Sequence, residues 1–362
     1  MTPAVYFSLI DYSCMFIDKI KAGDSGILTY GITPPKSGTD APRVAAIAQR
    51  TIERLIPLEM DALIVYDVQD ESDRTARERP FPFLNALDPF SFARDHLQAL
   101  QVPKIIYRPA GKFTKEELST WLDELQKQAF YPVFVGVPSP NHPVKTTLPE
   151  AYHLCNRHRA NSVIGAVAIP ERHAKLNDED KRILSKADCG VSYFITQCVF
   201  DMAYAKKMVE DLCHTCKQEN KRKPTIIFTL TACGSVKTLQ FMEWLGIHIP
   251  AATKTQLTGA GYMLQESVSI CLNIASALTK FCKQLHIPFG FNIESVAIRK
   301  DEIEASIGLF NSVSKMLEAE GVRSKDKISP APPADSLLGV FYNKVMSAND
   351  QRTRWEVFEV YK

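Results

Sequence analysis

The sequence predicts an α/β fold, a (β/α)8 or TIM barrel followed by a C-terminal extension. Short apolar runs alternate with stretches of helical periodicity along most of the 362 residues. The apolar runs lack strict alternation of polar and apolar residues, which is typical of parallel strands covered on both faces. The main competing fold, a doubly wound open sheet, would carry a glycine-rich GxGxxG turn after its first strand, and none is present.

Eight apolar runs are the predicted strands, and eight periodic stretches are the helices that cover them. The predicted strands are Ile27–Thr33, Ala62–Tyr66, Lys104–Tyr107, Pro132–Val137, Val163–Ile169, Val191–Thr196, Thr225–Leu230 and Phe289–Ile293. The predicted helices are Val44–Leu58, Pro89–Leu100, Lys115–Gln128, Glu179–Lys186, Met202–Lys217, Val236–Leu245, Gln265–Leu285 and Lys300–Leu317. Residues 1–25 are expected to form a short helix and turn before the first strand. We place the barrel in residues 1–318 and the extension, packed on the barrel or at a subunit contact, in residues 319–362.

Composition restricts the class of protein. A net charge of +2 gives no reason to expect nucleic acid or a membrane as a partner. No run of 18 uncharged apolar residues and no signal peptide is visible, and the nine scattered cysteines fit a reducing compartment. We therefore expect a cytoplasmic globular protein. Cys213 and Cys216 fall inside a predicted helix with no second CxxC, so we expect structural cysteines and no metal site.

Polar residues gather just after the predicted strands, where barrels bind their ligands. Four acids lie within the seven residues Asp67–Asp73 after the second strand, and Asp70 and Glu71 are candidate catalytic groups. Nearby arginines offer the alternative of a salt-bridged loop. Pro170–His173 follows the fifth strand and places a histidine beside Glu171. Gln197 ends the sixth strand, and its amide offers a donor and an acceptor to the edge of a heterocycle, although it equally suits satisfying loop backbone.

These motifs, in this order and spacing, resemble methylenetetrahydrofolate reductases, the flavin-dependent barrels of one-carbon metabolism. The resemblance covers roughly residues 26–315 and rests on Pro34-Pro35, Pro170-Glu171-x-His173, Phe194–Gln197 with Phe200-Asp201, and Ile249-Pro250-Ala251. It implies an oxidoreductase that passes hydride from NAD(P)H through FAD to a methylene-folate substrate, on the route to methionine biosynthesis. It also implies a small-molecule folate partner, and homo-oligomers are common among such barrels.

Family roles transfer to matching positions only. The resemblance implies that Gln197 and Leu257 contact the folate. It implies that the FAD contacts are Tyr66, Tyr107, Ser139, His173 and Lys186. Tyr107 stands where the family has histidine, and Ser139 where it has the aspartate that holds the flavin.

The family's catalytic glutamate on the first strand corresponds to Gly31. A positioned general acid is worth about 10²–10⁴-fold in rate, so another acid must replace it for the same reaction. The candidates are Asp67, Asp70, Glu71, Glu171 and Glu294, and we favour Asp70 and Glu71 because their loop adjoins the first strand. Glycine at position 31 should also open volume for a ligand or water.

Three alternatives remain open. The first is a reductase without flavin, in which the nicotinamide delivers hydride directly. The second is a catalytically retired or regulatory barrel that binds folate or flavin. The third is a barrel methyltransferase that works with a corrinoid or a zinc-bound thiol, which the cysteine spacing disfavours.

Overall fold

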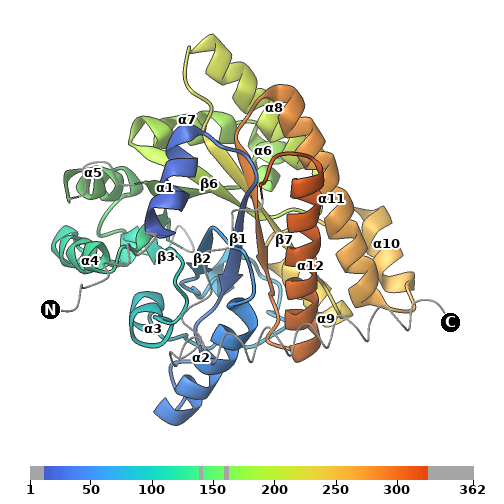
Figure 1. Cartoon of the computed structure of the whole chain (residues 1–362), viewed down its shortest axis with the longest axis horizontal. Coiled ribbons are helices and arrows are strands. Elements are labelled where there is room, and N and C mark those ends of the chain that lie inside the picture. The colour runs from blue at the N-terminus through green and yellow to red at the C-terminus, as the bar shows by residue number, and fades with distance from the viewer. Residues whose placement is uncertain (1–11, 138–141, 159–162, 325–362) are drawn as a thin grey trace, which may run out of the picture.

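A computed structural model describes residues 12–137, 142–158 and 163–324. Eight parallel strands pair in chain order and close into a barrel, with β1 hydrogen-bonded to β8 (Figure 1). The (β/α)8 prediction is therefore confirmed. The strands are β1 (Ile27–Ile32), β2 (Ala62–Val65), β3 (Lys104–Pro109), β4 (Tyr131–Val135), β5 (Ile164–Ala168), β6 (Val191–Cys198), β7 (Thr225–Thr231) and β8 (Phe289–Glu294).

Helices surround the barrel, and their buried faces form the larger apolar core against the outer faces of the strands. The long helices α11 and α12 pack side by side next to β8 (Figure 1). The helices are α1 (Tyr12–Ala22), α2 (Ala41–Leu55), α3 (Pro89–His96), α4 (Lys115–Lys127), α5 (Leu148–His158), α6 (Pro170–Leu176), α7 (Glu179–Asp188), α8 (Met202–Gln218), α9 (Val236–Trp244), α10 (Ala251–Gly259), α11 (Met263–Leu285) and α12 (Lys300–Ala319). Two 3-10 turns, η1 (Ser72–Arg74) and η2 (Ala110–Lys112), lie in loops.

Three of these helices were not predicted. α6 was expected to be a functional loop, but Pro170 occupies its first turn, where the missing N–H costs nothing, and Asn177 ends it in the left-handed conformation. α10 has Leu257 as its single buried residue, so it lacks an apolar stripe for sequence periodicity to reveal. α5, which begins at Leu148-Pro149, was not among the predicted helices.

A second, smaller core fills the barrel interior. Phe16 of α1 is fully buried at the amino-terminal end, with its ring centroid 5.5 Å from that of Tyr193 and 6.2 Å from that of Tyr131. Gly165 makes room for Tyr193, because a Cβ there would lie 2.6 Å from the tyrosine ring. The interior is thus packed at this end, and only the carboxyl ends of the strands are available to a ligand.

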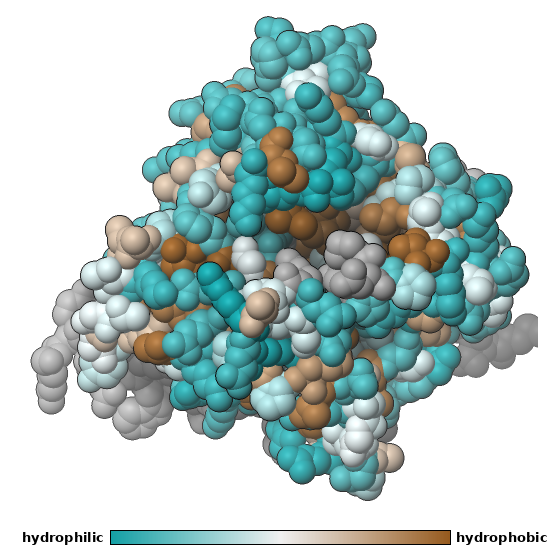
Figure 2. Space-filling view, turned by 180° about the vertical axis from the view of Figure 1, so that it is seen from behind, coloured by the Kyte–Doolittle hydropathy of each residue, from teal (hydrophilic) through white to brown (hydrophobic). Residues whose placement is uncertain are grey.

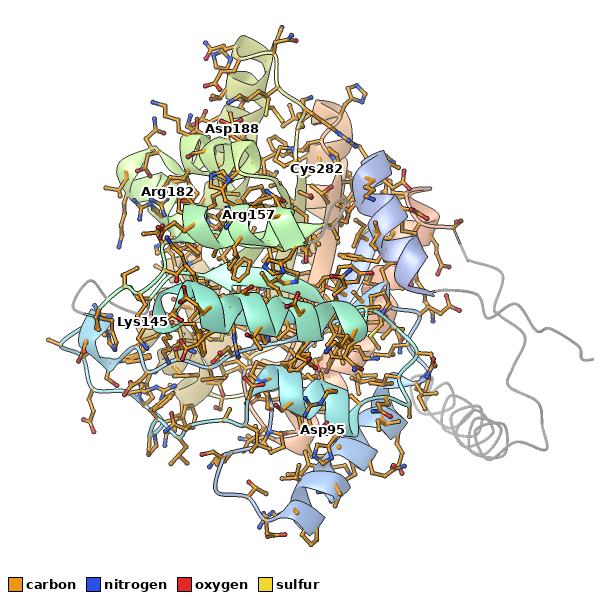
Figure 3. All side chains as sticks on the ribbon, turned by 90° about the vertical axis from the view of Figure 1, so that its left-hand side faces the viewer. Asp95, Lys145, Arg157, Arg182, Asp188 and Cys282 are labelled. Atoms are coloured by element: carbon orange, nitrogen blue, oxygen red, sulfur yellow. The ribbon has the colours of Figure 1, made fainter. Side chains whose placement is uncertain are left out.

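The outer surface is mostly polar. Charged residues such as Arg182 and Asp188 of α7 lie on the outer helices (Figure 3). On the side opposite to the view of Figure 1, hydrophobic residues gather in a central hollow (Figure 2). Among the described residues, no helix has both the length and the apolar character needed to cross a bilayer. Residues 325–362, which hold most of the proposed extension, lie outside the described residues, so its packing stays a prediction.

Candidate functional site

The site is a group of inward-facing side chains at the carboxyl ends of the strands. Because successive side chains of a strand alternate between its two faces, Thr29 and Gly31 of β1 point inward together with Asn292 and Glu294 of β8. Gly31 and Glu294 are register partners on these neighbouring strands. The missing glutamate of β1 and the carboxylate of β8 therefore occupy adjacent positions.

Glu294 is the centre of a polar network inside the barrel mouth. Cys198 donates its thiol to Oε1 at 3.2 Å, and Asn292 donates Nδ2 to Oε2 at 3.4 Å. The Tyr66 hydroxyl also bonds this carboxyl and accepts from Asn292 Nδ2 at 2.8 Å. Loss of hydration raises the pKa of Glu294 despite these donors. A carboxyl of this kind holds its proton to higher pH than an exposed glutamate does.

Tyr66 and Tyr107 line the mouth beside Glu294. Their rings meet edge to face with centroids 4.7 Å apart. Burial raises the pKa of both phenols well above the usual value, so both stay protonated near neutral pH. Sequence comparison with the reductases placed both tyrosines at the cofactor, and the structure brings them together at the mouth.

The space beside Gly31 is filled, so the expectation of open volume there is wrong. A Cβ on Gly31 would lie 2.8 Å from Tyr66 Cε2 and 3.2 Å from Glu294 Cβ. The tyrosine ring packs against the glycine and leaves no room for a larger residue on β1. The Tyr66 ring occupies the volume that a larger side chain at position 31 would need.

Gln197 lies on the β5–β6 side of the mouth. Its Nε2 donates to the carbonyl of Leu245 at 2.8 Å, which brings the segment between α9 and α10 over the end of β6. In that segment, His248 Nδ1 lies 2.9 Å from Asp201 Oδ2, and the His248 ring stacks on Tyr204 at 4.8 Å. The backbone N–H of His248 donates to Glu171 Oε1 at 3.4 Å.

Glu171 is almost fully buried in the first turn of α6. Burial raises its pKa to about 7. Within the part of the chain that the structure describes, its Oε2 has no hydrogen-bond partner. This acid belongs to the same side of the mouth as Gln197. A buried acid whose pKa is raised into the neutral range is a candidate site residue.

Asp70 and Glu71 lie on the segment between β2 and α3, and the side chains that bond Glu294 are Tyr66, Cys198 and Asn292. Asp70 is exposed and accepts from the backbone N–H of Ser72 at 3.0 Å and from its hydroxyl at 2.6 Å. These bonds lower the pKa of Asp70, so it is ionised at neutral pH and has no proton to give. Asp67, closer to the strand, accepts from Gln69 Nε2, and burial raises its pKa to about 6.

His173 joins α6 to α7 and α8, and Lys186 joins α7 to β5. His173 is buried, with Nε2 2.8 Å from Asp211 Oδ2 of α8 and Nδ1 3.8 Å from Asp180 Oδ1 of α7. Lys186 donates Nζ to the carbonyl of Val167 at 2.7 Å, and burial lowers its pKa to about 8. Leu257 is fully buried in the outer core, and Ser139 lies outside the described residues.

These positions test the fit of FAD to the chain. Of the five residues expected to hold it, Tyr66 and Tyr107 lie at the mouth, whereas His173 Nε2 is bonded to Asp211 of α8 and Lys186 Nζ to the Val167 carbonyl of β5. Two of the four described residues of the flavin assignment therefore have side chains engaged with other parts of the fold.

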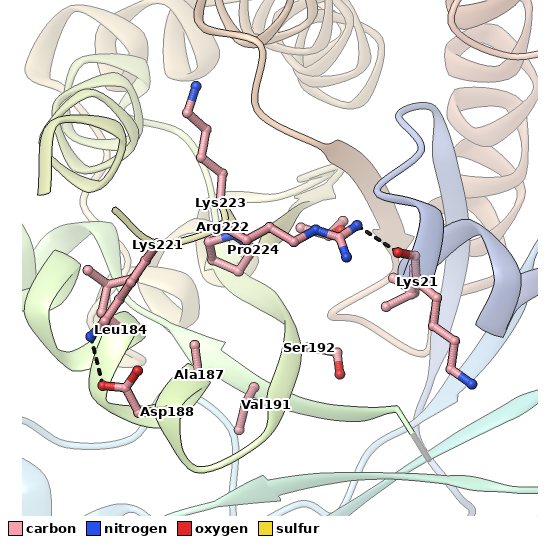
Figure 4. A pocket seen from close by; sticks show the side chains of 12 residues that line it. Lys21, Leu184, Ala187, Asp188, Val191, Ser192, Lys221, Arg222, Lys223 and Pro224 are labelled. Carbon is pink, nitrogen blue, oxygen red and sulfur yellow. Dashed lines mark hydrogen bonds and ion pairs between the residues drawn. The ribbon is translucent and has the colours of Figure 1, made fainter. Parts of the chain in front are cut away.

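A second hollow, of about 400 Å³, opens at the amino-terminal ends of β6 and β7 (Figure 4). It is lined by basic residues, but Lys221 Nζ lies 2.8 Å from Asp188 Oδ2 and Arg222 Nη2 donates to the Lys21 carbonyl at 2.6 Å. Since these cations already have partners and the hollow faces away from the mouth, it is not part of the site.

The sequence named Glu294 as one of five candidate acids without favouring it, and it did not single out Asn292. The available signal was their period-2 spacing at the end of the last strand, which points both side chains into a barrel. Asp70 and Glu71 were favoured over Glu294 because their loop adjoins the first strand. The register between β1 and β8, which no sequence pattern gives, places Glu294 beside Gly31.

No protein-family model and no curated protein matches the chain. Among solved structures, 2,3-dimethylmalate lyase matches with 11% identity, a TM-score of 0.43 and coverage of 95% of this chain and 100% of that one. Oxaloacetate acetylhydrolase matches with 9% identity, a TM-score of 0.45 and coverage of 96% and 98%. At these values neither enzyme supports a functional comparison.

One solved structure is much more similar. It is an uncharacterized protein from Clostridium thermocellum that binds two copies of 5-methyl-5,6,7,8-tetrahydrofolic acid. The two sequences are 40% identical, the TM-score is 0.73, and the match covers 83% of this chain and 99% of the Clostridium thermocellum chain. The chain therefore belongs to the same protein family as this Clostridium thermocellum barrel.

Proposed function

We propose that this protein binds a reduced folate of the 5-methyltetrahydrofolate type at the carboxyl-terminal mouth of its barrel. The observation that carries the proposal is the 40% identity to a folate-binding barrel that the chain covers almost completely. The mouth offers the chemistry that a pterin ring needs, namely aromatic faces from Tyr66 and Tyr107 and polar groups from Gln197 and Glu294.

We further propose that Glu294 is the general acid of a methylenetetrahydrofolate reductase-like reaction with NAD(P)H as electron donor. Reduction delivers a hydride to the methylene carbon, and the departing ring nitrogen takes a proton. Glu294 is supported for this role because burial raises its pKa and because it stands beside Gly31, where the family's acid is missing. Cys198, Asn292 and Tyr66 hold the carboxyl in place.

For the electron path, direct hydride transfer from the nicotinamide is favoured over FAD. The supporting observation is that His173 is bonded to α8 and Lys186 to the Val167 carbonyl of β5, so both polar groups already have partners. An absorption spectrum of the purified protein tests this choice. A yellow protein whose colour is bleached by NADH or NADPH would restore FAD, whereas a colourless protein that ignores added FAD supports direct transfer.

Calorimetry with 5-methyltetrahydrofolate tests binding, and the absence of heat up to millimolar ligand would overturn the proposal.

If turnover is found, Glu294→Gln should lower it by about 10²–10⁴-fold while binding changes little. Asp70→Asn and Glu71→Gln are the matched controls, since they remove carboxylates outside the network. Loss of turnover in these controls, with turnover kept in Glu294→Gln, would return the catalytic role to Asp70 and Glu71. Binding without any turnover would support a regulatory folate-binding barrel.

A further inference from the structure

Residues 67–87, the connection between β2 and α3, leave the strand at the mouth and reach a distant part of the barrel rim. Trp244 Nε1 of α9 donates to the Arg77 carbonyl at 3.0 Å. The ring of Phe81 meets that of Phe241, also on α9, with centroids 5.4 Å apart. Because α9 follows β7, this connection joins the β2 side of the rim to the β7 side.

The order of the strands shows what lies between β2 and α9 along the rim. In the closed barrel, β1 and β8 lie between β2 and β7. Along the rim, the shorter way from β2 to α9 runs past the carboxyl ends of β1 and β8, where Gly31 and Glu294 lie. This path is the ground for placing the segment beside the polar network of the mouth.

Arg79 contacts two aromatic rings of α9 at once. Its guanidinium carbon lies 5.1 Å from the ring centroid of Phe241, 5.0 Å from that of Trp244, and 5.2 Å from that of Phe83 in its own segment. Cation–π contacts of this kind depend on the position of one planar group over several rings. We propose that residues 67–87 form a lid over the mouth, and that Arg79 is the clasp that holds it on α9.

The contacts of the clasp suit a lid that opens. Within the described residues, Arg79 Nε and Nη1 are buried without a hydrogen-bond acceptor, so the guanidinium is held by ring contacts and by the charges of Asp70 and Glu71. The far end of the lid is fixed by backbone bonds instead. Ser37 N–H donates to the Asn85 carbonyl and Leu87 N–H to the Pro35 carbonyl, both at 2.8 Å. The lid can thus swing from α9 while its base stays attached to the loop after β1.

Cys198 gives a measure of opening that needs no ligand. Its thiol is buried and bonded to Glu294, on the side of the mouth that the proposed lid would cover. We would treat the full chain with iodoacetamide and follow each cysteine by peptide mass spectrometry. Arg79→Ala should raise the alkylation rate of Cys198 about tenfold, as expected for losing several cation–π contacts. Cys213, buried in α8, should be unaffected.

Arg94→Ala is the matched control, because Arg94 also lies over an aromatic ring, that of Phe90, but on α3. Phe241→Leu removes the α9 side of the clasp and should repeat the effect of Arg79→Ala if that variant folds poorly. Equal Cys198 rates in the parent protein and both clasp variants would overturn the lid, and so would an equal rise at Cys213, since it would indicate general loosening.

The role of the lid in ligand access rests on the proposed function. 5-Methyltetrahydrofolate should slow Cys198 alkylation in the parent protein, and its association rate should rise in Arg79→Ala. If 5-methyltetrahydrofolate slows Cys198 alkylation in none of the variants, the proposed folate binding is contradicted and the lid is not. Faster alkylation with an unchanged association rate would overturn the gating role.

Discussion

At the residue scale, the side chains of Tyr66 and Glu294 both lie next to Gly31 at the barrel mouth. Glycine on β1 lets the tyrosine ring pack against the strand, and the carboxylate stands one strand away on β8. Putting a glutamate back at position 31 would displace Tyr66, whose hydroxyl bonds both Asn292 and Glu294. A glutamate at position 31 therefore requires Tyr66 to leave its observed position.

We predict that Gly31→Ala destabilises the protein by about 1–3 kcal/mol, the usual cost of adding a methyl group to a packed core. The new Cβ would press on the Tyr66 ring at 2.8 Å. Gly38→Ala is the control, because a Cβ there would have no neighbour within 4 Å. Urea unfolding gives both free energies. Equal values for the two variants would show that Tyr66 yields without cost.

Glu171 should make stability depend on pH. Its pKa in the folded protein is about 7, against a usual value of 4.5, so the folded state binds the proton more tightly than the unfolded chain does. Its contribution is favourable below about pH 4.5 and is lost as the pH rises from there to about 7. The loss is on the order of 3 kcal/mol.

Glu171→Gln should remove this dependence, so that the variant is more stable than the parent protein at pH 8 and closest to it near pH 4. Thermal or urea unfolding across this range measures the difference. A constant difference at all pH values would mean that Glu171 titrates like an exposed acid.

At the scale of elements, all eight strands were predicted with bounds within two residues of those observed. Strands buried on both faces produce apolar runs that need no knowledge of neighbours. α10 could not be found in this way, since Leu257 is its single buried residue. The candidate site was predictable as a place, the carboxyl ends of the strands, but Glu294 depended on the register of β8 against β1.

The direction of a helical side chain was equally out of reach. His173 was read as a mouth residue because Pro170–His173 follows a strand. In α6, however, it points to Asp211 of α8 and Asp180 of α7, so it joins three helices. A sequence gives the position of such a residue along the chain, whereas the neighbouring helices decide which surface it meets.

We predict that His173→Ala destabilises the protein by about 2–4 kcal/mol, through a cavity and unpaired acids among the helices. Binding of folate at the mouth should change little. His214→Ala, at an exposed position of α8, is the control and should leave stability unchanged. Calorimetric unfolding together with ligand titration separates the two effects. A stable His173→Ala protein with lost ligand binding would support the cofactor role that the family resemblance implies.

At the scale of the whole molecule, the barrel is joined at its amino-terminal end by one buried acid. Asp61 Oδ2 accepts from the Leu28 N–H at 2.7 Å and from Arg323 Nη1 at 2.6 Å. Lys19 Nζ of α1 lies 2.7 Å from Asp61 Oδ1. A helix before the first strand, the start of β2 and the chain after α12 therefore meet at one carboxylate.

We predict that Arg323→Ala lowers the unfolding free energy by about 3 kcal/mol, because it leaves Asp61 buried with less compensation. Arg323 also donates to the carbonyls of Gly26 and Glu59, at 2.9 and 2.6 Å, so the variant frees both loops at this end. Asp61→Asn added to Arg323→Ala should recover part of the loss, since it removes the uncompensated charge.

Arg299→Ala, which breaks an exposed pair with Asp301, is the control and should leave stability unchanged. Urea unfolding of these variants gives the coupling. Strictly additive losses for Asp61 and Arg323 would mean that α1, β2 and the chain after α12 are held independently, and that the barrel closes without this shared carboxylate.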